Sequence, residues 1–133
     1  MFYSWDITVP ADTPESAPLM QFLPLTKGVI TNVNIRFPAG CHGLVKIRLL
    51  RFEHALEPLN RDDWITGDDE PINISEFYEL KESPARLKFV GYSEGSFYPH
   101  VITVRVTVLP KNIASLVPVI DLLSKMMQRL GFL

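Results

Sequence analysis

The chain has 133 residues and a mass of 15.1 kDa, which fits one domain of ordinary size and leaves little room for a second. Lys and Arg number 13 against 15 Asp and Glu, so the formal net charge of -2 provides no basic excess for a phosphate backbone, and we expect no nucleic-acid partner. Apolar residues make up 47% and charged residues 21%, which excludes general disorder.

The N-terminal part of the chain predicts a strand, a loop and a second strand. Residues 3–9 alternate large apolar with polar side chains, which is typical of a half-buried strand. Residues 10–18 contain three prolines and two acids, so they predict a surface loop or arm. Residues 19–25 predict a short edge strand, because Pro24 interrupts them. The first residues lack a basic stretch followed by an apolar one, so we expect no secretory signal.

The middle and late segments show the same period of two. Residues 29–37 and 45–49 alternate apolar with polar side chains on either side of a loop, which predicts a hairpin. Residues 102–108 alternate most clearly and predict a central strand. Weaker strand candidates are residues 64–66, 72–74, 77–80 and 87–91.

The arrangement of these elements predicts an all-β fold. About eight short strands with no long helix between them exclude a parallel βαβ sheet and favour an antiparallel β-sandwich of the jelly-roll type. We therefore expect one β-sandwich domain over residues 1–110, with its Pro-rich arm at 10–18. Residues 111–133 are then expected to form one C-terminal amphipathic α-helix used for packing or assembly.

The expected helix carries the main functional inference. Its apolar seam, at steps of four, three, four and three, consists of Leu116, Ile120, Leu123, Met127 and Leu130. Apolar side chains occupy most of the circumference, so we predict that a partner surface covers them, either in a homo-oligomer or on another protein. The competing interpretation is that the helix packs against its own sandwich. A membrane span is not expected, because Asp121, Lys125 and Arg129 interrupt the run.

The residue types that carry chemistry are scattered. The single Cys41 is interpreted as a small hydrophobic residue, and the three histidines lack the spacing of metal ligands. The acidic stretch at 62–70 does not match the calcium-loop pattern, so a solvated loop is the preferred interpretation. We therefore expect no enzyme, no cofactor and no metal.

Aromatic side chains in loops supply an alternative function. Rings beside acids and amides can stack on the apolar face of a sugar, which predicts a carbohydrate-binding, lectin-like module. Its candidate ligand-binding residues are Trp64, Tyr92, Phe97 and Tyr98. The competing interpretation is that these rings close the ends of the sandwich core.

A short sandwich without catalytic groups, a Pro-rich arm and an apolar C-terminal helix resemble the layout of small virion structural proteins of tailed phages, especially head-decoration or minor capsid proteins. The resemblance implies a homo-oligomer, with a trimer favoured, that binds a larger protein assembly such as a capsid. It also implies a place on the virion surface after assembly in the host cytoplasm. Under this hypothesis, the arm and helix add contacts beyond the globular domain.

Overall fold

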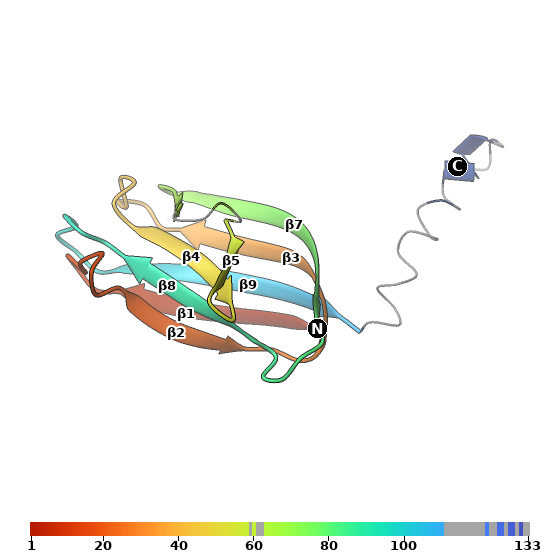
Figure 1. Ribbon diagram of the computed structural model, residues 1–133. Coiled ribbons are helices and arrows are strands. Elements are labelled where there is room, and N and C mark those ends of the chain that lie inside the picture. Colours follow the sequence, from red (N-terminus) through yellow and green to blue (C-terminus); the bar gives the residue numbers. More distant parts are fainter. Residues whose placement is uncertain are drawn as a thin grey trace.

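The fold is built from strands in two layers (Figure 1). The computed structural model describes residues 1–58, 60 and 63–110, together with 122, 125, 126, 128, 129 and 131. Its strands are β1 (Phe2–Val9), β2 (Leu19–Pro24), β3 (Gly28–Phe37), β4 (Lys46–Arg51), β5 (His54–Glu57), β6 (Ile65–Thr66), β7 (Glu70–Leu80), β8 (Arg86–Tyr92) and β9 (His100–Leu109). They form two antiparallel sheets, so the predicted all-β antiparallel sandwich is confirmed.

The first sheet has four strands in the order β1-β9-β3-β7. Strand β9 lies between β1 and β3, as its uninterrupted alternation predicts. Its Val104 pairs with Trp5 on one side and with Ile35 on the other, and all three side chains face the second sheet. The central position of β9 follows from its β-branched residues, which fit a pleated surface with one face fully buried.

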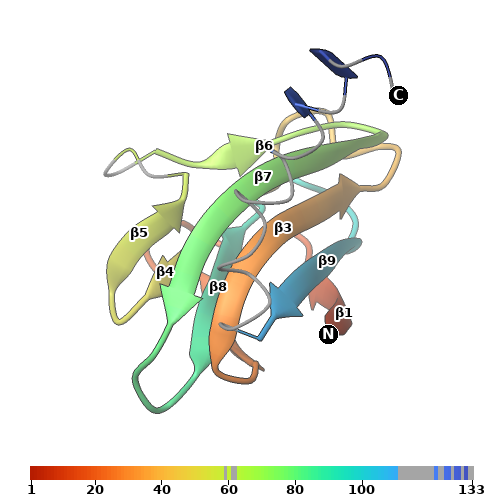
Figure 2. The same cartoon turned by 90° about the vertical axis from the view of Figure 1, so that its right-hand side faces the viewer.

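The second sheet has the order β2-β8-β4-β5, with the short β6 pairing to β4 as well. The expected edge strand at residues 19–25 is confirmed, because β2 pairs with β8 alone among the described strands. Pro24 has no backbone N–H to donate, and it is tolerated here because an edge strand pairs on one side only. One side of the sandwich ends in β1 and β2 (Figure 1), and the other ends in β7 and β5 (Figure 2).

Two expectations about pairing are wrong. The predicted hairpin of residues 29–37 and 45–49 does not form, because β3 pairs with β7 and β9 whereas β4 belongs to the other sheet. The loop at 38–45 instead crosses between the layers. The separate candidates at 72–74 and 77–80 are parts of the single strand β7, and the sequence pattern does not predict β5.

The core lies between the sheets and is filled by side chains of the strands and the loop after β3. Phe37 and Phe89 are the largest of its fully buried side chains, and the other described apolar residues buried in the core lie between Ile7 and Val108. Tyr3 and Trp5 stack at 5.8 Å and are only partly buried, so they close the core near β1. Within the described part of the chain, no helix is long and apolar enough to cross a membrane.

Candidate functional site

The residues of the predicted assembly seam lie outside the described part of the chain. Those residues are Leu116, Ile120, Leu123, Met127 and Leu130. Among the neighbours that are described, Leu122 is 59% exposed and Met126 is 49% exposed. The predicted C-terminal helix and its contacts therefore remain a prediction, and the described surface of the sandwich provides the other candidates.

Two of the four aromatic residues proposed for sugar binding lie in contact. The ladder between β4 and β8 pairs Lys46 with Tyr92, and the ladder between β4 and β6 pairs Lys46 with Thr66. These pairings bring Trp64, just before β6, onto the ring of Tyr92 in an edge-to-face contact with centroids 4.8 Å apart. The guanidinium of Arg48 lies 4.4 Å from the centroid of Trp64, so one face of the indole is already covered.

The outer face around this pair is basic although the whole chain is acidic. Strands β2, β4 and β8 carry no Asp or Glu in their sequences, and the basic residues on this face are Lys46, Arg48, Arg86 and Lys88, whereas Arg51 is buried. The guanidinium of Arg86 lies 3.8 Å from the ring centroid of Phe22, and Lys88 forms an ion pair with Glu53 at 2.8 Å. A pocket of about 320 Å³ lies between Phe22 and Phe52 on this face. Such a surface suits a partner with acidic and apolar groups.

The other two proposed sugar-binding residues occupy a different position, in the loop between β8 and β9. Phe97 is 89% exposed and Tyr98 is 73% exposed. Ser96 fixes the loop by donating its hydroxyl hydrogen bond to the carbonyl of Tyr98 at 2.9 Å, and Gly95 N donates to Asp12 Oδ1 at 2.8 Å. The loop is thus tied to the Pro-rich arm and presents two aromatic rings to solvent.

The described acids near the loop at 63–70 bind the backbone and neighbouring cations. Asp68 Oδ1 accepts hydrogen bonds from the amides of Gly40 and Cys41 at 3.0 and 3.1 Å. Asp69 forms an ion pair with Arg36 at 3.3 Å. The described residues include no cluster of three metal-ligating side chains. These acids therefore have structural roles in the turn that follows β3.

Cys41 is fully buried and belongs to the core cluster. Burial, reinforced by the negative charge of Asp68, raises the pKa of its thiol. A raised pKa favours the neutral thiol over the nucleophilic thiolate. This environment agrees with a hydrophobic packing role for Cys41.

A pair of carboxyl groups that the sequence analysis did not identify lies at the β5–β7 side. Glu57 is only 6% exposed, and its Oε1 is enclosed without a hydrogen-bond donor among the described residues. Burial, together with the hydrogen bond and the negative charge of Glu76, raises the pKa of Glu57 to about 8. A signal was present in the sequence, because Glu76 takes an inward position in the alternating run of Ile72, Ile74 and Tyr78.

Comparison with known proteins identifies no family. The chain matches no protein-family model and no curated protein sequence. Among solved structures, it is similar to the crystal structure of the Yersinia pseudotuberculosis-derived mitogen, with a TM-score of 0.43 and 9% sequence identity. The alignment covers 82% of this chain and 86% of that chain. A likeness at this level carries no argument about function.

Proposed function

We propose that the chain is a non-enzymatic assembly protein with a jelly-roll domain, of the capsid-decoration or minor virion type. The strand orders β1-β9-β3-β7 and β2-β8-β4-β5 support the jelly roll, because every two successive strands except β4 and β5 lie in different four-stranded layers once the short β6 is set aside. The jelly roll occurs in viral capsid proteins and in lectins alike. The choice between those functions therefore depends on the surface and not on the fold.

The observation that carries the proposal is the apolar seam that the sequence places after Pro110. The seam lies outside the described part of the chain, whose core is formed by side chains of the strands and of the loop after β3. In this proposal the seam faces a partner protein instead of solvent. Exposing several large apolar side chains forgoes about 1.5 to 3 kcal/mol each, so five would forgo an amount comparable to the whole stability of a domain. A second copy or a shell protein would recover that free energy.

The loop between β8 and β9 supports a second contact with the partner. Phe97 and Tyr98 are exposed on a backbone that is tied to the arm by hydrogen bonds, so little ordering entropy would be lost when the rings are buried. Aromatic side chains are also enriched in protein–protein interfaces. In this proposal residues 111–133 form the homo-oligomer, with a trimer favoured. The β8–β9 loop and the Pro-rich arm add contacts to the capsid on the virion surface.

The test of oligomer formation is the molar mass of the protein in solution. We expect Ile120→Asp combined with Leu123→Asp to dissociate the oligomer and to leave the sheet signal in circular dichroism unchanged. The matched control is Ser124→Asp combined with Gln128→Asp, which adds the same charge to the same segment at polar positions. If the two double variants and the wild-type protein all had the same molar mass, an oligomer formed through residues 111–133 would be contradicted.

A carbohydrate-binding function is the second candidate, and the half-buried ring of Trp64 favours it, whereas Tyr92 is only 6% exposed and supports that ring from below. Arg48 and Lys46 flank these rings, so the sugar would carry acidic groups as well as an apolar face. A glycan array should then show saturable binding that Trp64→Ala abolishes and Tyr98→Ala, at the separate loop, leaves intact. Absence of saturable binding by the wild-type protein would rule this candidate out.

A further inference from the structure

The carboxyl pair joins two strands that share no ladder among the described residues. Glu57 ends β5, which is the edge of the second sheet, and Glu76 lies within β7, which is the edge of the first sheet. The pair therefore spans the side of the sandwich opposite β1 and β2, where β5 and β7 lie in different layers (Figure 2). Opposite them, by contrast, the loop at 10–18 connects β1 directly to β2.

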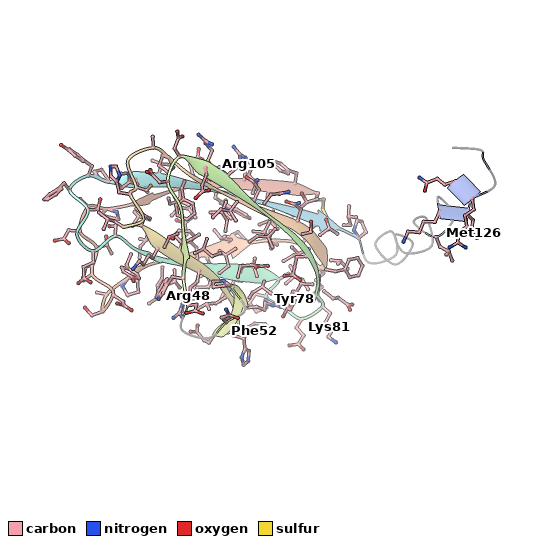
Figure 3. The ribbon with its side chains drawn as sticks, turned by 90° about the horizontal axis from the view of Figure 1, so that it is seen from above. Arg48, Phe52, Tyr78, Lys81, Arg105 and Met126 are labelled. Atoms are coloured by element: carbon pink, nitrogen blue, oxygen red, sulfur yellow. The ribbon has the colours of Figure 1, made fainter. Side chains whose placement is uncertain are left out.

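The carboxyls line a pocket of about 230 Å³ between the two edge strands. The ionisable residues around it are Arg51 on β4, His54 and Glu57 on β5, and Glu76 and Tyr78 on β7. An adjoining pocket adds Glu79, Lys81 and Glu82, and Figure 3 shows Tyr78 and Lys81 on the same side of the molecule as Phe52.

Arg51 lines the same pocket and could neutralise the pair, but its guanidinium is used elsewhere. Nη1 donates to the carbonyls of Pro84 and Arg86 at 2.6 and 3.0 Å, and Nη2 donates to the carbonyl of Glu82 at 2.9 Å. Its planar group also lies 3.8 Å from the ring centroid of Phe52. Arg51 thus holds the loop between β7 and β8, and one carboxyl oxygen of Glu57 receives no donor from the described part of the chain.

Glu57 is buried and Glu76 is half-buried, and two carboxyl groups in contact repel each other when both are ionised, so the buried Glu57 favours its protonated form. We propose that this proton, shared by Glu57 and Glu76, fastens β5 to β7 across the gap between the sheets, and that its loss opens this side of the sandwich. The opening is local, because β5 has only four residues and its pairing with β4 shifts register between Leu49 and Leu50. This inference does not depend on the proposed function.

The test is amide hydrogen exchange of the full chain at pH 6 and pH 9, followed by mass spectrometry, with a chelator present to exclude metal ions. Comparison of variants at the same pH removes the intrinsic pH dependence of exchange. At pH 9 we expect the peptide that contains residues 54–57 to be at least about tenfold less protected in the wild-type protein than in Glu57→Gln. At pH 6 the two proteins should agree in this peptide.

Further variants separate the shared proton from a simple change in charge. Glu76→Gln should also keep protection at pH 9, and it serves as the test if Glu57→Gln does not fold. Glu94→Gln, in an exposed loop, should behave as the wild-type protein does. Equal protection at pH 9 in the wild-type protein and the folded Gln variants would overturn the proposal. Equal loss in the peptide of β9 would also overturn it, because the opening would then be global.

Discussion

Replacing Glu57 by Gln should change how the stability of the whole domain depends on pH. The folded protein raises the pKa of Glu57 from its ordinary value of 4.5 to about 8, so it binds this proton more tightly than the unfolded chain does. A raised carboxyl pKa makes the folding contribution most favourable below pH 4.5, and that contribution is lost as pH rises to about 8. Gln has no such proton to lose, so its variant should not show this decline.

The size of the effect follows from the difference in proton affinity between the folded and unfolded chains. A tenfold difference in that affinity corresponds to about 1.4 kcal/mol, so a pKa that rises from 4.5 to about 8 sets an upper limit of about 5 kcal/mol. Because the pocket communicates with solvent and β5 can open, we expect about 2 to 5 kcal/mol.

Urea unfolding at pH 5, 7 and 9 would measure this prediction. The free energy of unfolding of the wild-type protein should fall relative to that of Glu57→Gln as pH rises, with most of the change between pH 5 and 8. The Glu94→Gln variant, which removes one exposed carboxyl, should run parallel to the wild-type protein. The reasoning would be refuted if Glu57→Gln and wild-type stabilities ran parallel across this range, since the pair would then hold no tightly bound proton.

Three further changes test the structural roles of single residues. Arg51→Met removes a guanidinium that donates hydrogen bonds to three carbonyls of the β7–β8 region. It should lower the free energy of unfolding by about 2 to 4 kcal/mol in urea titrations. A loss below about 0.5 kcal/mol would show that water replaces these hydrogen bonds fully. Gly28→Ala places a Cβ 2.5 Å from the carbonyl oxygen of Leu109, so β3 and β9 must separate locally. The free energy of unfolding should fall by about 1 to 3 kcal/mol, which lowers the thermal midpoint by several degrees. An unchanged midpoint would contradict this close approach. Asp68→Ala leaves two turn amides without their acceptor and should lower the free energy of unfolding by about 1 kcal/mol. It should also speed alkylation of the buried Cys41 thiol. An unchanged alkylation rate would show that the turn keeps its structure without this carboxylate.

The alternating segments could be predicted because one face of each strand is buried. The β9 pattern is the clearest case, since alternate residues from Ile102 to Val108 face the core while Thr103, Arg105 and Thr107 face outwards. The pattern does not specify a partner strand, however. The predicted hairpin of residues 29–37 with 45–49 is therefore wrong, because period two fits pairing within a sheet and crossing between sheets equally well.

Strand β5 could not be predicted from its own residues. His54, Ala55, Leu56 and Glu57 have neither alternation nor β-branched side chains, and their extended form depends on pairing with β4. The contact of Trp64 with Tyr92 likewise arises from two separate ladders, which no local pattern in the sequence specifies.

The Glu57–Glu76 pair depends on how the two sheets are stacked. Only the inward register of Glu76 marks that position in the sequence, and nothing in the sequence identifies its partner. Tertiary packing, and not a local pattern in the sequence, therefore brings Glu57 and Glu76 together and raises the pKa of Glu57.

The central claim is that residues after Pro110 mediate assembly, and the most direct measurement is the molar mass of the purified chain by sedimentation equilibrium. The account predicts a multiple of 15.1 kDa, three copies being favoured, which falls to a single copy in Ile120→Asp with Leu123→Asp. A wild-type chain that sediments as 15.1 kDa at all concentrations, alone and with candidate shell proteins, would contradict it.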